Sequence, residues 1–97
     1  MILGFREKGT ADIYDDLSSA GARRTLPKAL WRLAQRKLII LDRAVDLHDL
    51  RVPPSNHLEA LKGDRAGQHS VRINGQYRIC FEWTPRGPTN VEIVDYH

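Results

Sequence analysis

The chain has 97 residues, of which 41% are hydrophobic and 28% charged, and this composition is typical of one small folded domain spanning residues 1–97. A single cysteine, Cys80, excludes an internal disulfide and favours a reducing compartment. No apolar run approaches the roughly 20 residues that a membrane span requires, and the opening residues are too few for a signal peptide, so we expect a cytoplasmic protein. The net charge of +3 weakly favours an anionic or acidic partner.

The first third of the chain predicts a short strand followed by a short helix. Residues 2–5 are apolar and favour a strand. Thr10 is a candidate N-cap for a helix that places Ile13, Tyr14 and Leu17 on one face. The small residues at 18–21 predict a turn that ends this helix.

A second, longer helix follows Pro27, where a first helical turn tolerates proline. Lys28, Arg32 and Arg36 form a basic face with i, i+4 spacing. A solvated surface is the simpler interpretation of that face, and binding of RNA or of an acidic partner is the alternative. Pro53-Pro54 ends helical structure. The apolar stripe opposite the basic face recurs at spacings of three and four: Trp31, Ala34, Leu38, Leu41 and Val45.

From residue 56 onward the hydrophobic period changes to two. Leu58 and Ala60 alternate with His57 and Glu59, which predicts a strand that ends near or bulges before Lys62. Two further runs, at 69–74 and 77–83, flank an Asn-Gly pair typical of a hairpin. The last strand is predicted over 90–94.

The register of the hairpin follows from its apolar residues. A two-residue loop at Asn74-Gly75 would place Val71 and Arg78 on one face, which a half-buried sheet does not allow. A loop with an odd number of residues, with Gly75 in a left-handed bulge, places the apolar set on one face. Arg72 and Arg78 then share the opposite face. The predicted fold class is therefore α+β, with helices covering one face of a small antiparallel sheet.

The polar face of this sheet is suited to phosphodiester chemistry. The planar guanidinium groups of Arg72 and Arg78 match phosphate oxygens, with Lys62 nearby. Such a reaction also requires a proton acceptor and a proton donor, and Glu59, Asp95 and His97 are the candidates. Tyr96 offers a ring on which an unstacked base can lie.

Three stretches of the sequence resemble one known family. Residues 61–68 (LKGDRAGQ), residues 70–74 (SVRIN) with 77–79 (YRI), and the closing Val94-Asp95-Tyr96-His97 are similar to HigB toxins of the RelE superfamily. The resemblance covers essentially the whole chain. It implies a microbial RNase-like fold with two N-terminal helices packed on an antiparallel sheet.

The resemblance also implies an activity and partners. The implied activity is ribosome-dependent cleavage of mRNA in the A site by attack of a ribose 2′-hydroxyl, with no metal or other cofactor. The implied partner is a HigA-like helix-turn-helix antitoxin, and the operator DNA is bound only through the complex with it.

Site residues carry over by motif. By this resemblance, Arg78 matches the phosphate-binding arginine of the HigB family and Lys62 matches the lysine of its Leu-Lys-Gly motif. The closing Asp95, Tyr96 and His97 match the family's catalytic residues. The sequence departs from the family pattern at Glu59, where many relatives have histidine. The proton acceptor is therefore Glu59, Asp95 or His97. The RNA-binding set that we expect is Lys62, Arg65, Arg72, Arg78 and Tyr96.

A second function is compatible with the same residues. A non-catalytic RNA- or ribosome-binding module, or a degenerate toxin that serves mainly as partner of its antitoxin, would need the arginines. It would have little use for an acid–base group at the end of the chain.

Overall fold

The computed structural model describes residues 1–96, and it joins three α-helices to one antiparallel sheet, as the predicted α+β class requires. Short 3-10 turns connect several of these elements. The regular elements are α1 (Lys8–Tyr14), α2 (Ala20–Thr25), α3 (Trp31–Arg43), β1 (Glu59–Ala60), β2 (His69–Arg72), β3 (Tyr77–Thr84) and β4 (Gly87–Asp95).

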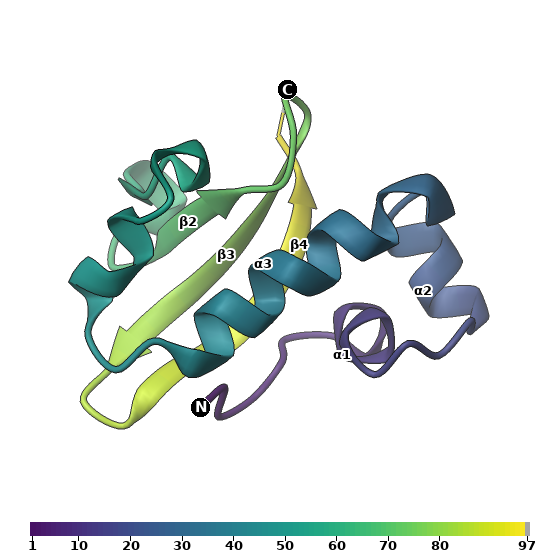
Figure 1. The fold of residues 1–97 in the computed structure, drawn as a ribbon, viewed down its shortest axis with the longest axis horizontal. Helices are drawn as coiled ribbons and strands as arrows, with labels where there is room; N and C mark the ends of the chain where they lie inside the picture. Colours follow the sequence, from purple (N-terminus) through teal and green to yellow (C-terminus); the bar gives the residue numbers. More distant parts are fainter. Residues whose placement is uncertain (97) are drawn as a thin grey trace.

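The sheet has the order β1-β2-β3-β4, so each strand pairs with its neighbour in the chain. Figure 1 shows α3 lying across β3 and β4, with α1 and α2 beyond the β4 side of the sheet. Phe81 and Ile79 of β3 are fully buried beneath the helices, together with Leu38 and Leu41 of α3. No helix within residues 1–96 is long and apolar enough to cross a membrane.

The predicted apolar stripe is confirmed over α3, except at its end. Trp31, Ala34, Leu38 and Leu41 are all buried. Val45 is 90% exposed, because the helix ends at Arg43 and the extended backbone of Ala44 turns the chain away. The α-helix begins at Trp31, since residues 28–30 form a 3-10 turn after Pro27.

The predicted turn at 18–21 is wrong, because it contains the start of α2. The Ser19 side chain accepts a hydrogen bond from the backbone N–H of Ala22 and caps this six-residue helix. The chain thus has two helices before α3 rather than one. Thr10 is also not an N-cap. It lies inside α1, where its hydroxyl donates to Glu7 and accepts from the backbone N–H of Ile93 in β4.

The predicted first strand at 2–5 is an extended segment with one isolated parallel bridge, Phe5 to Val91. It runs beside β4, where the Leu3 N–H donates to the Pro88 carbonyl and the Val91 N–H donates to the Gly4 carbonyl. The segment therefore protects the outer edge of β4.

The predicted hairpin register is confirmed. Val71 pairs with Ile79 and Arg72 with Arg78 across a three-residue loop at 74–76. The expected left-handed Gly75 is wrong, because Gly75 is not among the positive-φ residues. The Asn74 side chain closes the loop instead, since its Oδ1 accepts from the backbone N–H groups of Gln76 and Tyr77.

The strand predicted around residues 57–60 is reduced to the two residues of β1. His57 has left-handed backbone angles, with φ 43° and ψ 57°, and ends a 3-10 turn. After Ala60 the chain turns into the 3-10 turn Gly63–Arg65, which Lys62 precedes. Glu59 and Lys62 are three residues apart, so a continuous strand would direct them to opposite faces; the strand ends at Ala60, and this alternation does not reach Lys62.

Candidate functional site

A cavity of about 360 Å³ opens on the sheet face opposite the helices, at the loop end of the β2–β3 hairpin. Both arginines predicted to bind phosphate belong to it, together with Glu59 and Tyr96. The described residues that line it are His57, Glu59, Arg72, Asn74, Gly75, Arg78 and Tyr96.

Arg78 is the most rigidly held of the lining side chains, with only 8% of its surface exposed. Its Nε donates to Ser70 Oγ at 2.6 Å, and its Nη2 donates to the carbonyl oxygens of His57 and Ser70. These bonds occupy one side of the guanidinium. Nη1 is left facing Glu59, at 3.9 Å from its Oε1. A phosphate could therefore approach Nη1 without disturbing the bonds that orient the group.

Arg72 lies directly opposite Arg78 in the β2–β3 pair, and its side chain is half-buried. Like charges in this arrangement destabilise a sheet unless an anion lies between or beside them. Among residues 1–96, Glu59 of the neighbouring strand is the carboxylate in the cavity lining, and its side chain is 55% exposed. The cavity thus combines two guanidinium groups with one solvent-accessible carboxylate.

The residues predicted at the end of the chain separate in the structure. Tyr96 lines the cavity, is 41% exposed, and is held by a 2.6 Å hydrogen bond from its backbone N–H to the carbonyl of Gln76. Asp95 pairs with Tyr77, so the alternation of the strand directs it to the helix-covered face, and its Oδ2 accepts from the side chain of Gln76. His97 lies outside the described residues.

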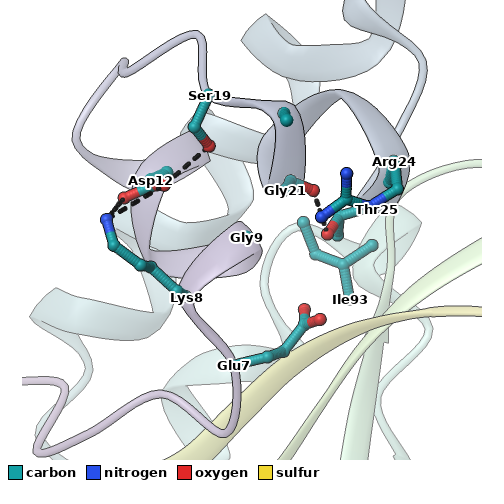
Figure 2. Close-up of a pocket in the computed structure, with 10 residues that line it drawn as sticks. Glu7, Lys8, Gly9, Asp12, Ser19, Gly21, Arg24, Thr25 and Ile93 are labelled. Atoms are coloured by element: carbon teal, nitrogen blue, oxygen red, sulfur yellow. Dashed lines mark hydrogen bonds and ion pairs between the residues drawn. The ribbon is translucent and has the colours of Figure 1, made fainter.

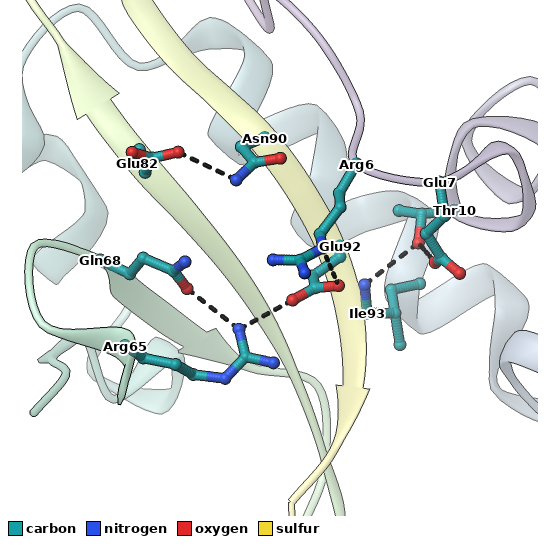
Figure 3. Close-up of polar contacts among 9 residues, drawn as sticks. All are labelled: Arg6, Glu7, Thr10, Arg65, Gln68, Glu82, Asn90, Glu92 and Ile93. Carbon is teal, nitrogen blue, oxygen red and sulfur yellow. Dashed lines mark hydrogen bonds and ion pairs between the residues drawn. The ribbon is translucent and has the colours of Figure 1, made fainter. Parts of the chain in front are cut away.

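Lys62 and Arg65 are not part of the cavity lining. Lys62 is exposed on the loop after β1. Arg65 reaches across the sheet, where its Nη1 donates to Glu92 Oε1 at 2.7 Å and to Gln68 Oε1 at 3.0 Å. Figure 3 shows this arginine and Arg6 on opposite sides of the Glu92 carboxylate. The hydrogen bond to Glu92 raises the pKa of Arg65, and the structure gives this arginine a role in joining the 61–68 loop to β4.

A larger cleft of about 740 Å³ lies between α1 and α2, and its polar groups bind one another (Figure 2). Asp12 accepts from Ser19 Oγ at 2.7 Å and from Lys8, and Thr25 Oγ1 donates to the Gly21 carbonyl. The hydrogen bond from Ser19 lowers the pKa of Asp12. The bond from Ser19 to Asp12 joins α1 to the start of α2, whereas the other two contacts lie within α1 and within α2.

Neither a metal site nor a reactive thiol emerges from the described part of the chain. Within residues 1–96, no group of three or more His, Cys, Asp or Glu side chains is placed to hold a metal ion. Asp46 and Asp49, which flank His48, form a capping box for the 3-10 turn Leu47–Arg51. Cys80 is buried, and desolvation raises the pKa of its thiol, so the reactive thiolate form is disfavoured.

The sequence did not indicate that the His57 carbonyl orients Arg78. A backbone carbonyl leaves no signal in side-chain identity, and the left-handed turn that aims it is made by contacts distant in sequence. Ser70 was predictable in part, because the alternation of β2 and β3 places it on the same face as Arg78.

From residue 3 onward, the sequence matches a known protein family. A family model described as a RelE-like toxin of the type II toxin–antitoxin system HigB matches residues 3–97. The chain belongs to the HigB-like toxin family.

Two curated proteins are similar in sequence to this chain, and one of them is named as a HigB toxin. The chain is 40% identical to Toxin HigB-1 of Vibrio cholerae serotype O1 over 83 residues, which is 86% of this chain and 84% of the relative. It is also 36% identical to an uncharacterised protein of Haemophilus influenzae over 58 residues, 60% of this chain and 57% of that protein. The resemblance found in the sequence is confirmed. This member of the family is the toxin of a type II toxin–antitoxin system, which implies an antitoxin partner.

Proposed function

We propose that this HigB-like toxin is an endoribonuclease that cleaves mRNA in the ribosomal A site and thereby stops translation and growth. The observation that carries the proposal is the cross-strand pair of Arg72 and Arg78, which faces a cavity also lined by Glu59 and Tyr96. Among residues 1–96, the cavity lining carries two arginines and one carboxylate, which leaves an excess of positive charge there. A phosphodiester would supply the missing negative charge.

The reaction that fits these groups is an internal transfer at phosphorus. The ribose 2′-oxygen attacks the adjacent phosphorus, the bond from phosphorus to the 5′-oxygen breaks, and a 2′,3′-cyclic phosphate and a free 5′-hydroxyl result. The 2′-hydroxyl proton passes to a base, and an acid protonates the leaving 5′-oxygen. Arg78 and Arg72 would stabilise the additional negative charge on phosphorus, which is usually the largest catalytic contribution in such a site.

Glu59 is the base in this proposal, because it is the carboxylate that lines the cavity and its Oε1 lies 3.9 Å from Nη1 of Arg78. Asp95 belongs to the other face of the sheet by the register of β4. Tyr96 provides a stacking surface for a base of the mRNA. Proton donation to the leaving oxygen is assigned to His97, the family's terminal residue, and Lys62 and Arg65 would contact RNA outside the cavity.

The proposal also covers the compartment, the antitoxin partner and the operator DNA. The toxin would act in the cytoplasm without a cofactor, and a HigA-like helix-turn-helix antitoxin would neutralise it. The operator DNA of the pair would be contacted through the antitoxin in the complex.

The decisive experiment compares two arginine substitutions. Arg78→Ala removes the oriented guanidinium, and we expect mRNA cleavage on programmed ribosomes to fall by about 10²- to 10³-fold. Arg78→Lys keeps the positive charge but loses the planar guanidinium that can donate two parallel hydrogen bonds, and it should recover only a small part of the activity. Arg86→Ala, in the exposed turn between β3 and β4, is the matched control and should cleave like the wild type.

A non-catalytic binding module is the alternative outcome. Such a protein would arrest growth equally well when truncated after Val94, because the arginines remain. Loss of cleavage and of growth arrest in the truncated chain, with ribosome binding retained, is the result that we expect from an enzyme.

A further inference from the structure

Lys37 of α3 is a buried lysine that the reaction described above does not use. It is 8% exposed, and within residues 1–96 none of the ion pairs gives it a carboxylate partner. Desolvation by burial lowers the pKa of its ammonium group. Burying a cation without a counter-ion is costly, and an apolar residue at this core-facing position of α3 would avoid that cost. A specific hydrogen-bonding role would explain why the lysine is there.

The hydrogen-bond partner of Lys37 is a buried asparagine. Lys37 Nζ donates to Asn56 Oδ1 at 2.6 Å and to Ser55 Oγ at 3.4 Å. Asn56 is 1% exposed, and its Nδ2 donates to the carbonyls of Leu50 and Val52 at 3.1 and 3.2 Å. One side chain therefore joins α3 to both ends of the irregular segment at 50–56.

The residue after Asn56 is the one whose backbone reaches the cavity. His57 has a left-handed conformation that non-glycine residues rarely adopt, with φ 43° and ψ 57°. In that conformation its carbonyl oxygen accepts from Arg78 Nη2. Asn56 is bonded on both sides of its amide group, and the bond from Lys37 is one of the three that hold this residue next to His57.

We propose that Lys37 and Asn56 are positioning residues for the reaction, which hold the His57 carbonyl so that it orients the Arg78 guanidinium toward the substrate phosphate. The inference depends on the proposed function for its catalytic consequence. Its structural part, the link from Lys37 to Arg78, stands independently. Neither Lys37 nor Asn56 lines the cavity, so neither contacts the substrate.

Two measurements on Lys37→Met test the link. This substitution keeps the apolar stem and removes the donor. We expect kcat for ribosome-dependent mRNA cleavage to fall about 10- to 100-fold with KM changed less than about twofold, because a misoriented catalytic group affects the transition state most. With ¹⁵N-labelled arginine, the Nε–Hε resonance of Arg78 should shift and exchange faster. The Arg86 Nε–Hε signal should stay in place, as should the backbone resonances of β3 in uniformly ¹⁵N-labelled protein.

Two comparisons separate positioning from general destabilisation. Arg43→Met, an exposed basic residue at the end of the same helix, should leave kcat and the Arg78 resonance unchanged. Lys37→Met and Asn56→Ala should be non-additive in kcat, since both break the same link. If Lys37→Met does not fold, Asn56→Ser replaces it, because a serine hydroxyl is too short to reach Lys37 and both carbonyls, and the same fall in kcat is expected.

Each result decides one part of the inference. An unchanged kcat and an unchanged Arg78 resonance in Lys37→Met, with Arg78→Ala inactive, would refute the positioning role while leaving the proposed function intact. An Arg78→Ala protein that still cleaves would refute the proposed function. In that case the resonance alone decides whether Lys37 orients Arg78.

Discussion

Arg72 and Arg78 are direct cross-strand partners on the face of the sheet that the helices do not cover. Arg78 is fixed by three internal hydrogen bonds, whereas Arg72 is half-buried at the same cavity. Two cations held this close store an unfavourable interaction in the free protein. An anionic ligand would relieve it, and several consequences can be measured.

Arg72→Gln should stabilise the free protein and weaken RNA binding. Removing one of two opposed charges is expected to raise the free energy of unfolding by about 0.2–1 kcal/mol at low salt. The slope of log affinity against log salt for single-stranded RNA should become shallower by about 0.7, the contribution of one phosphate contact. Denaturant unfolding and a salt titration of RNA binding measure the two effects. A steeper slope, or no change in it, would remove Arg72 from the RNA contact set.

Glu59→Gln should remove the proposed general base while RNA binding is retained. We expect cleavage to fall by about 10²-fold or more, with affinity for uncleavable 2′-deoxy substrate unchanged or slightly higher, since a negative charge near the phosphate is lost. Glu59→His supplies a neutral base and should restore cleavage, above the wild-type rate if the carboxylate repels the phosphate. A Glu59→Gln protein with wild-type kinetics would refute the assignment of Glu59 as the base.

Gly9→Ala should destabilise the contact between α1 and α2. A Cβ on Gly9 would overlap Thr25 Oγ1 and lie 2.8 Å from the carbonyl oxygen of Gly21, and Figure 2 shows the two glycines facing each other. The expected loss is about 1–3 kcal/mol, typical of overpacking. Gly21→Ala is the matched control, because its Cβ would meet Gly9 at an ordinary 3.7 Å. Alanine favours the helix there, so Gly21→Ala should be neutral or stabilising by about 0.5–1 kcal/mol in thermal unfolding.

Asp12 should make part of the stability sensitive to acid. Its pKa is lowered below the ordinary value of 3.8, chiefly by the hydrogen bond from Ser19 and further by Lys8. A carboxyl group whose folded pKa is lowered contributes stability above its unfolded pKa and loses that contribution as the pH falls through the folded value. Asp12→Asn should therefore unfold more easily at pH 7, and the difference from the wild type should shrink below about pH 4. Urea midpoints measured between pH 7 and pH 2.5 would show whether the two curves converge.

Much of the architecture could be predicted from local patterns. The period-two alternation placed Val71 and Ile79 on one face and Arg72 and Arg78 on the other, and the requirement for a single apolar face fixed an odd hairpin loop. The apolar stripe of the long helix from Trp31 to Leu41 could also be predicted, and its residues are buried. The errors lie where short segments depend on distant partners. The six-residue α2 has no stripe of its own and is stabilised by the Gly9–Gly21 contact and the Ser19 cap.

The candidate site shows the same division. Sequence motifs identified Arg78, Arg72, Glu59 and Tyr96, which line one cavity, because residue type and strand alternation are local properties. They also grouped Lys62, Arg65 and Asp95 with the site, whereas the structure places these three side chains outside its lining. The end of β1 at Ala60, the ion pair of Arg65 with Glu92 and the register of β4 account for the three departures.

The fold class, the family and the charged groups follow from periodicity and residue identity, which are properties of the linear chain. Which of those groups meet, and how Arg78 is oriented, depends on how the folded chain packs. Its orientation depends on a backbone carbonyl at His57 that is positioned through Asn56 by a lysine on α3. That arrangement joins three segments far apart in the chain, and no local preference encodes it, because hydrogen bonds between distant segments form only when the whole core has packed.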